Sequence, residues 1–419
     1  MSQTVSHQAE YAEHTVDQVD GASAATQSPP PSPLRRLPLQ GRARSIVEWL
    51  SVVLAIYVMI TAVSTIGSGF QAATGGQAEE LFSFASNPFV ALVIGILATA
   101  LTQSSSTTTS IVVGMVAGGL PIETAIPMLM GANVGTTMTS TLVSLGAATD
   151  RQQFRRAFSA ASVHDMFNLL AVGLLLPLEL IFGFLGNMAT WFAGVTTGTD
   201  GGIVATVFST FGDAVSAVTS PGADLVEASV LAVLPEVIGG IVMIALGIAL
   251  ILLIIKFISN MLKTLLVGKA EKVFHSAIGR GPVSGIFSGM LITVMVQSSS
   301  TTTSLTVPMA ASGKFSLWQI YPFTVGANIG TTMTAMIAAF GFTGVEGTAA
   351  MTAAAVHLLY NVLATLVIFL IPVLRPIPVR GAEWLGNLAA KNKMYVLVWL
   401  AGLFVVLPAL LIGISTLLF

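Results

Sequence analysis

Long apolar stretches, separated by short polar or basic segments, follow one another from about residue 46 to the end of the chain. An α-helix needs about 20 apolar residues to cross the hydrocarbon core of a bilayer. The pattern therefore predicts an all-α polytopic membrane protein. The expected spans are Ile46–Gly69, Ile122–Leu145, Ala157–Leu185, Leu225–Ile255, Leu317–Phe340, Thr348–Val373 and Tyr395–Leu418.

Two further apolar stretches are interrupted at their centre by polar residues. Stretches 88–119 and 282–313 each carry the octapeptide QSSSTTTS, at Gln103–Ser110 and Gln297–Ser304. Buried hydroxyl and amide groups are costly in hydrocarbon unless they bind a ligand or line water. We interpret each stretch as a re-entrant helical hairpin with its polar tip at mid-membrane. Ser and Thr are also common packing residues in membranes, but the recurrence of the whole octapeptide favours a binding site.

The octapeptide belongs to a longer repeat. GANVGTTMT at Gly131–Thr139 matches GANIGTTMT at Gly326–Thr334, and the His-x-x-Phe-Asn segment beginning at His164 matches His-x-x-Tyr-Asn beginning at His357. Each repeat is predicted to contain a span, a hairpin and two further spans. We expect the GTTMT segments, taken alone, to serve helix packing, and the two histidines to make structural hydrogen bonds rather than carry protons.

The distribution of basic residues predicts how the repeats lie in the membrane. The chain is 54% hydrophobic and 9% charged, with a mean hydropathy of +0.86. Lys and Arg are absent from residues 45–150 and 157–255. When the basic clusters are placed in the cytoplasm, as the positive-inside rule requires, one hairpin enters from outside and the other from inside. Two inverted-topology repeats of this kind are typical of secondary transporters with a site at mid-membrane.

The same pattern divides the chain into five parts. Residues 1–44 are polar and rich in proline, so we expect a disordered cytoplasmic tail. Repeat 1 covers residues 45–185 and repeat 2 covers residues 225–375, with an extracytoplasmic connection at 186–224. Residues 376–419 are expected to form an amphipathic linker and a final span. The basic patch at the end of the tail is interpreted as a topology anchor, so no nucleic-acid partner is expected.

The polar tips suit both an oxyanion and a cation. Donors at helix N-termini suit oxyanions, whereas hydroxyl and carbonyl oxygens suit a hard cation such as sodium. Apart from Lys314 near a hairpin exit, no Lys or Arg lies in the predicted membrane interior. An anion there needs cations beside it, because helix dipoles supply only fractions of a charge. This favours cation-coupled anion symport over an anion channel, which typically has rings of basic residues.

The acidic and nucleophilic residues indicate one further functional residue and exclude two kinds of site, a serine hydrolase centre and a thiolate metal site. Asp165 lies inside a predicted span, and its repeat partner is the apolar Leu358. An intramembrane carboxylate is a functional hypothesis by default; the alternative is an interfacial acid paired with Arg155 or Arg156. A serine hydrolase would need a positioned base beside its Ser, and no such pattern is present, so no enzyme is expected. The chain has no Cys, which excludes thiolate metal sites.

At these residues the chain resembles the type II sodium–phosphate cotransporter family. The resemblance rests on the two QSSS copies, the two GANxGT segments and the stretch from Asp150 to Asn168, and it covers most of about 46–375. It implies inverted repeats, QSSS hairpins at the substrate site and coupling to sodium. The residues expected to contact phosphate are Gln103, Ser104, Ser105, Ser106, Asn133, Gln297, Ser298, Ser299, Ser300 and Asn328. Those expected to bind sodium are Gln103, Ser106, Thr107, Thr136, Thr139, Asp150, Asp165, Gln297, Ser300, Thr301, Thr331 and Thr334.

Two positions depart from the family pattern. Ala147 replaces a Gln three residues before Asp150, and Ala327 replaces a Ser in the second GAN segment. Both changes remove possible sodium ligands, whereas Asp165 stands where electrogenic members carry an acid linked to an additional sodium ion.

Together these features predict a sodium-coupled phosphate symporter that works by alternating access. It is expected as a multi-pass protein in a bacterial inner membrane, with a cytoplasmic N-terminus. Its partners are expected to be phosphate, sodium and the lipid bilayer, with no organic cofactor. Symport of another oxyanion and a passive anion channel are the alternatives.

Overall fold

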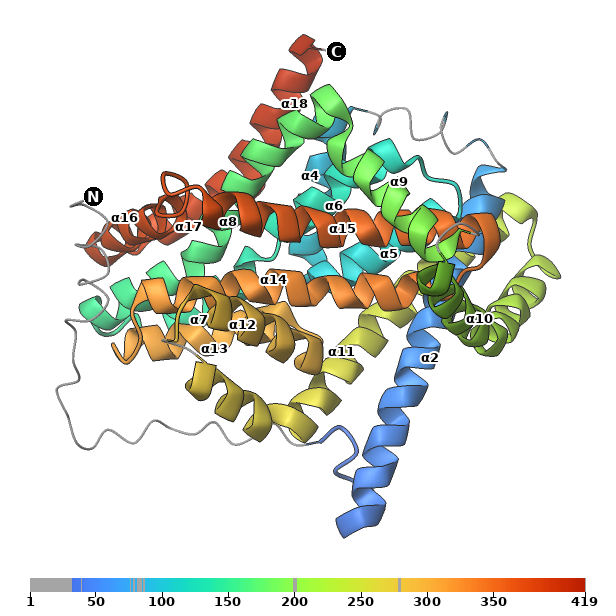
Figure 1. Ribbon diagram of the computed structural model, residues 1–419, viewed down its shortest axis with the longest axis horizontal. Coiled ribbons are helices and arrows are strands. Elements are labelled where there is room, and N and C mark those ends of the chain that lie inside the picture. Colours follow the sequence, from blue (N-terminus) through green and yellow to red (C-terminus); the bar gives the residue numbers. More distant parts are fainter. Residues whose placement is uncertain are drawn as a thin grey trace. The chain divides into compact units, whose positions relative to one another are not determined.

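The computed structural model describes residues 32–38, 40–75, 77, 80, 85, 87–198, 202–277 and 280–418 (Figure 1). Within these ranges the chain is helical and contains no β-strand, as the apolar pattern predicted. Most of the expected N-terminal tail lies outside the described residues.

The helices fall into two successive groups with a similar order. The first half consists of α2 (Gly41–Thr74), α4 (Pro88–Thr102), α5 (Ser105–Ala117), α6 (Ile122–Val134), α7 (Thr137–Leu145) and α8 (Arg151–Phe182). The second half consists of α11 (Glu236–Ala277), α12 (Pro282–Val296), α13 (Ser299–Ala311), α14 (Leu317–Ala339) and α15 (Gly344–Leu370). Between the halves lie α9 (Phe184–Thr197) and α10 (Gly202–Leu231), and after them come α16 (Ile377–Lys391), α17 (Met394–Ala401), the π-helix η2 (Gly402–Val406) and α18 (Leu407–Leu418).

Six described helical segments are long and apolar enough to cross a membrane. They are Gly41–Thr74, Arg151–Phe182, Gly202–Leu231, Glu236–Leu266, Gly344–Leu370 and Met394–Leu417. Four of the predicted spans, which begin near residues 46, 157, 348 and 395, fall on these segments. The prediction of a multi-pass membrane protein is thereby confirmed.

Two predicted spans have the wrong helix boundaries. The span expected at Leu225–Ile255 is interrupted, because the chain turns at residues 232–235 and α11 begins directly after Pro235. Proline lacks an N–H and fits best at or just before the first turn of a helix. Residues 186–224, expected to be a connection between repeats, are occupied by α9 and most of α10. The span expected at Ile122–Leu145 is divided into α6 and α7.

Matching glycines bring the helices of each half into close contact. A methyl group at Gly131 of α6 would strike the carbonyl oxygen of Leu92 in α4, and one at Gly326 of α14 would strike that of Ile286 in α12. Small residues that let two backbones approach are typical of helix packing in membranes. The glycine of each GAN segment therefore fixes a helix crossing.

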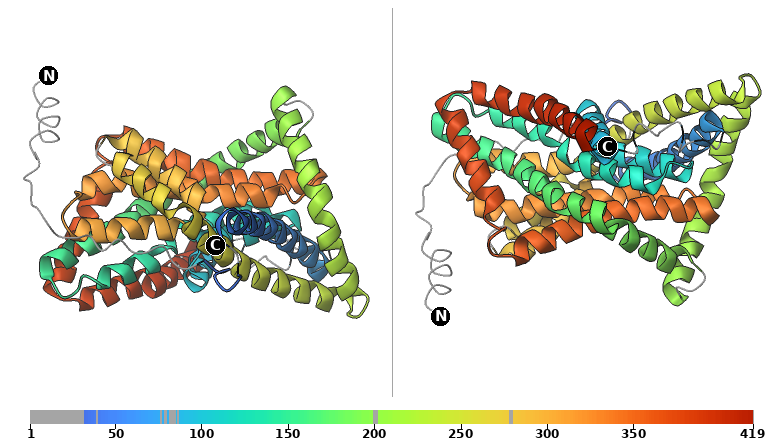
Figure 2. Two further views of the ribbon diagram at one scale, coloured as in Figure 1. Left: turned by 90° about the horizontal axis from the view of Figure 1, so that it is seen from below. Right: turned by 90° about the horizontal axis from the view of Figure 1, so that it is seen from above.

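The two halves also pack on each other. Helix α5 contacts α14 and α15, whereas α13 contacts α7 and α8. Helix α2 packs along α11, and both views of Figure 2 show the blue α2 beside the yellow-green first part of α11. The second helix of each short pair thus lies against long helices of the opposite half.

We expect Gly131→Ala to lower the thermal unfolding midpoint in detergent, because the added methyl group has no room between α4 and α6. Overpacking of this kind costs about 1–3 kcal/mol. Gly173→Ala is the matched control, since Gly173 lies in α8 and a methyl group there would meet no atom within 4 Å. The control is expected to hold or raise the midpoint, because Ala favours a helix more than Gly does. Equal midpoints for the two variants would contradict this account of the crossing.

Candidate functional site

Each octapeptide breaks its helix pair with the same two residues. Gln103 and Gln297 have φ angles of 52° and 53°, and among the described residues they are the only non-glycine residues with positive φ. This left-handed conformation is strained for a side chain with a Cβ, and such strain is concentrated at functional sites. The glutamine therefore ends the first helix of each pair at a fixed point.

The serine after each glutamine begins the second helix of the pair. Ser104 Oγ accepts a hydrogen bond from the backbone N–H of Thr107 at 3.2 Å, and Ser298 Oγ accepts one from Thr301 at the same distance. These are N-cap contacts, and the remaining N–H groups of the first turn have no partner within the helix. Helices α5 and α13 thus each present a capped N-terminus, a structure suited to an anion.

The two tips differ in their surroundings. Gln297 Oε1 accepts a hydrogen bond from Thr334 Oγ1 of α14 at 2.9 Å, so α14 holds the second tip. Gln103 is exposed, and its side chain has no hydrogen-bond partner among the described residues. Ser105, Ser106 and Ser299 are buried, while Ser300 is half-buried.

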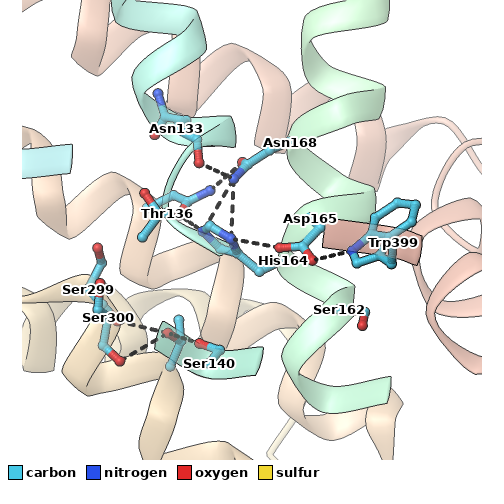
Figure 3. A network of polar contacts seen from close by, with 12 residues as sticks. Asn133, Thr136, Ser140, Ser162, His164, Asp165, Asn168, Ser299, Ser300 and Trp399 are labelled. Carbon is cyan, nitrogen blue, oxygen red and sulfur yellow. Dashed lines mark hydrogen bonds and ion pairs between the residues drawn. The ribbon is translucent and has the colours of Figure 1, made fainter. Parts of the chain in front are cut away.

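A chain of buried amide side chains connects the two halves (Figure 3). Asn168 Nδ2 of α8 donates to the backbone carbonyl of Asn133 at 2.8 Å. Asn328 Nδ2 of α14 donates to Asn168 Oδ1, also at 2.8 Å. His164 Nε2 lies 2.6 Å from Asn328 Oδ1, which completes the network. Two of the predicted phosphate contacts, Asn133 and Asn328, are therefore brought together.

The carbonyl group of Asn133 sets the direction of every bond in this network. A carbonyl can only accept, so Asn168 must turn its NH₂ toward Asn133 and its oxygen toward Asn328. Asn328 then presents its own oxygen to His164, and His164 Nε2 must carry a hydrogen. The prediction that His164 makes structural hydrogen bonds is confirmed.

In the second half, the equivalent network is open, which means that, among the described residues, its histidine and asparagine side chains do not bond to each other or to the opposite half. Both ring nitrogens of His357 and the side-chain oxygen of Asn361 are buried without a hydrogen-bond partner. Asn361 Nδ2 donates only to the backbone carbonyl of His357, one turn earlier in α15. The prediction of structural hydrogen bonds is therefore wrong for His357 in this conformation.

The matching GAN segments also differ in backbone structure. The helix stops at Val134 and restarts at Thr137 in the first half, whereas α14 runs without interruption through Asn328. In an unbroken α-helix, the carbonyl of Asn133 would accept from the N–H four residues later. At the break this carbonyl keeps only a long backbone contact, from the N–H of Thr136 at 3.5 Å, and accepts its shorter bond from Asn168 at 2.8 Å.

Asp165 is completely buried in α8. Its Oδ2 accepts a hydrogen bond from the indole Nε1 of Trp399 in α17 at 3.2 Å, and its Oδ1 has no hydrogen-bond partner. The nearest ionisable partner is His164, whose Nδ1 lies 3.7 Å from Oδ1. The alternative interpretation as an interfacial acid paired with Arg155 or Arg156 is wrong, since Asp165 is fully buried and neither arginine forms an ion pair with it among the described residues. Sequence reasoning missed Trp399, which lies 234 residues away along the chain.

Asp150 lies at the N-terminus of α8, away from Asp165. It is exposed and caps the N-terminus of α8, where Oδ1 accepts from the N–H groups of Gln152 and Gln153 at 2.9 and 2.7 Å. Fifteen residues of helix separate it from Asp165, a rise of about 22 Å. The two acids therefore cannot serve the same ion site in this conformation.

Four of the eight predicted sodium-ligand hydroxyls bond to a residue three or four positions earlier in the chain. Thr136 and Thr331 donate to the carbonyls of Ala132 and Ala327, and Thr107 and Thr301 contact the cap serines. Thr139 is half-buried in α7. The described residues contain no group of three or more His, Asp or Glu that could hold a metal ion. A cation here would depend on hydroxyl, amide and backbone oxygens, the ligands of hard cations.

One further contact joins the halves close to the second tip. Ser140 Oγ of α7 and Thr303 Oγ1 of α13 lie 3.1 Å apart, and Thr303 also contacts the carbonyls of Ser299 and Ser300. In Figure 3, Ser299 and Ser300 lie beside Ser140, below the amide network.

Comparison with known proteins identifies relatives along most of the chain. The family described as Na+/Pi-cotransporter matches residues 58–198 and 250–372. Sodium-dependent phosphate transport protein 2A of Oryctolagus cuniculus is 33% identical over 443 residues, covering 90% of this chain and 69% of that protein. The 2A protein of Ovis aries is 32% identical, with 86% and 66% covered. The 2B protein of Homo sapiens is 30% identical, with 86% and 64% covered.

This chain thus spans about two thirds of the length of these relatives. No solved structure matches it significantly. Helix α10 and helices α16 to α18 lie outside the two matched ranges.

We expect Asn328→Ala to destabilise the protein more than Asn361→Ala does. The first change leaves His164 Nε2 and Asn168 Oδ1 buried without partners, at about 1–3 kcal/mol each. The second removes only a bond to a carbonyl of its own helix. Thermal unfolding midpoints in detergent provide the comparison, and a larger loss for Asn361→Ala would contradict the assigned network.

Proposed function

Because the chain belongs to the Na+/Pi-cotransporter family, we propose that it carries inorganic phosphate and sodium ions together across a membrane. Membership of a transporter family confirms the prediction that the chain is not an enzyme. The observation that carries the proposal is the pair of QSSS breaks, each of which exposes a capped helix N-terminus beside a strained glutamine.

Phosphate is proposed to bind at the N-termini of α5 and α13. The free N–H groups of their first turns and the serine hydroxyls supply donors for the oxygens of a tetrahedral oxyanion. The proposed contacts are Gln103 to Ser106, Gln297 to Ser300, Asn133 and Asn328. The buried amide network supports the inclusion of the two asparagines, because it holds both on one path between the halves.

Sodium supplies the charge that this region lacks. Moving a phosphate dianion into a cell at about −100 mV costs about 4.6 kcal/mol, and each entering sodium ion returns about 2.3 kcal/mol. Two ions balance the dianion, and a third makes the cycle electrogenic. We assign the third ion to Asp165, because its Oδ1 is buried without a hydrogen-bond partner and its nearest ionisable neighbour is His164, 3.7 Å away, rather than a Lys or Arg.

The remaining sodium ligands are proposed among the oxygens of the two tips and the adjoining threonines. Their positions are Gln103, Ser106, Thr107, Thr136, Thr139, Gln297, Ser300, Thr301, Thr331 and Thr334, to which we add the exposed carboxylate of Asp150 at the N-terminus of α8. The Thr334–Gln297 hydrogen bond supports this group, since it places two of the proposed ligand oxygens 2.9 Å apart.

Each short helix pair is proposed to be a re-entrant hairpin. Helices α4 and α12 contain 15 residues and α5 and α13 contain 13, so each is about 20–22 Å long at 1.5 Å per residue. This length does not cross a hydrocarbon core of about 30 Å. The positive-inside pattern supports opposite entry of the two hairpins and a cytoplasmic N-terminus. The membrane is proposed to be a bacterial inner membrane.

Alternating access is proposed to exchange the structures of the two halves. One half has a broken GAN helix and a closed His–Asn network, and the other has a continuous helix and an open network. Inverted repeats can exchange such roles when the site opens to the opposite face. In the opposite state, we expect α14 to break near Asn328 and His357 and Asn361 to gain partners.

We expect phosphate uptake into proteoliposomes of the purified chain to require a sodium gradient. Radioactive phosphate uptake is measured with sodium outside, and with sodium replaced by choline or potassium. Uptake driven by sodium and lost in choline supports symport. Phosphate flux that ignores sodium would show a passive channel instead, and competition by other tetrahedral oxyanions measures selectivity.

The variant Thr334→Val tests the second tip in the same phosphate-uptake assay. This variant keeps the side-chain shape but removes the hydrogen bond to Gln297, so we expect the sodium concentration for half-maximal uptake to rise about threefold to tenfold. Thr324→Val is the matched control in α14, because its hydroxyl donates only to the carbonyl of Ile320. An equal effect of both variants would argue against a role for the Gln297 contact.

A disulfide between Ser140→Cys and Thr303→Cys is expected to stop uptake. The two side-chain oxygens lie 3.1 Å apart across the halves, so oxidation should lock α7 to α13. The natural chain has no Cys, which excludes competing bonds. Each single cysteine variant and the reduced double variant are the controls and should transport phosphate. Full uptake by the cross-linked protein would mean that α7 and α13 do not separate during the cycle.

A further inference from the structure

The carboxylate of Asp165 is the buried acid with the fewest protein partners in this region. It has no accessible surface, one hydrogen bond from Trp399, and one oxygen without a hydrogen-bond partner. A buried charge is unfavourable unless it is paired, and no Lys or Arg forms an ion pair with it among the described residues. Such a carboxylate requires a cation, a proton or both.

The position of Trp399 fixes the direction of this carboxylate. The indole N–H binds Oδ2, so Oδ1 is turned away from Trp399 and toward His164, where Figure 3 shows the amide network beginning. An indole can donate but cannot accept, so it stabilises only the oxygen that it touches. The free oxygen is therefore the one that faces the path between the two halves.

The surroundings of Trp399 hold it rigidly. Its ring packs on the cluster formed by Phe154, Phe158, Leu385, Ala389 and Val396, in which α8, α16 and α17 meet. Helix α16 packs along α8, where Gly386 lies directly against Ser159 and the carbonyl of Arg155. The π-helix η2 follows three residues after Trp399, and π-turns inside helices are frequent at functional sites.

We propose that Trp399 is a positioning residue that orients Asp165 for cation binding. The proposal rests on the proposed function, since it assumes that Asp165 binds a transported sodium ion. It extends the site to a helix outside the ranges that match the family, which end at residue 372. Trp399 does not touch the ion; it acts by holding Oδ2, so that Oδ1 remains available.

Trp399→Phe removes the N–H donor and retains an aromatic ring in the cluster. The sodium concentration for half-maximal phosphate uptake is expected to rise about tenfold, because a hydrogen bond to a charged group is lost. Trp384→Phe is the matched control: its indole, in α16, is 60% exposed and has no hydrogen-bond partner among the described residues. The control should leave the sodium dependence unchanged.

A double-mutant cycle separates positioning from general packing. In an Asp165→Asn background, Trp399→Phe is expected to cause no further change, because both substitutions disturb one contact. Additive effects of the two substitutions would overturn the proposal. The phosphate concentration for half-maximal uptake, measured at saturating sodium, is expected to stay the same in Trp399→Phe.

Tryptophan fluorescence supplies a readout that does not depend on transport. Replacing Trp49, Trp191, Trp318 and Trp384 by Phe leaves Trp399 as the only indole of the chain. Sodium chloride, but not choline chloride, is expected to change its emission in the absence of phosphate, and Asp165→Asn is expected to abolish the change. A spectrum that ignores sodium in a variant that still transports would overturn the proposal.

The outcomes also distinguish a failure of sodium-driven phosphate uptake from a failure of the positioning role of Trp399. Wild-type protein without sodium-driven uptake would refute the proposed function. Wild-type protein with such uptake, together with Trp399→Phe behaving like Trp384→Phe, would refute only the positioning role.

Discussion

The hydrogen bond from Asn168 to the backbone carbonyl of Asn133 is the interaction on which the centre of this protein depends. A poorly satisfied buried carbonyl is costly in an apolar helix bundle, and at the break between α6 and α7 the backbone offers Asn133 only a long contact from the N–H of Thr136, at 3.5 Å, so the Asn168 side chain supplies the short bond that the regular helix would have made. The same bond orients Asn168, then Asn328 and then His164. One broken turn thus links α6 and α8 of the first half to α14 of the second.

This dependence also explains why the halves are unequal. The first half satisfies the linked amide and imidazole groups of Asn168 and His164, whereas the second leaves both ring nitrogens of His357 and the side-chain oxygen of Asn361 without hydrogen-bond partners. Unsatisfied buried groups raise the free energy of a conformation. Two conformations of similar free energy, in which the unsatisfied groups lie in opposite halves, suit a transporter better than one fully satisfied conformation. The close glycine crossings of α4 with α6 and of α12 with α14 keep each half intact during such an exchange.

The scarcity of basic residues near the tips gives the proposed coupling its physical basis. Helix N-termini supply donors and partial charge, which are enough to orient an oxyanion but not to balance a dianion. In the proposed cycle, sodium ions act as co-substrates and supply the positive charge that the site lacks. The contact of Trp399 with Asp165 suggests that the last helices participate in this arrangement, although they lie outside the matched family ranges.

Local features of the sequence predict most of the membrane spans and the two helix breaks of this protein. Apolar length predicted most spans, and the octapeptide predicted both helix breaks, because helix termination and capping act over a few residues. The GAN segments mark the limit of such rules: they differ only at Val134 and Ile329, yet one is broken and the other is continuous. The hydrogen-bond partners of Asn133, Asn328 and Asp165 lie 35, 160 and 234 residues away, and only packing brings them within hydrogen-bond distance.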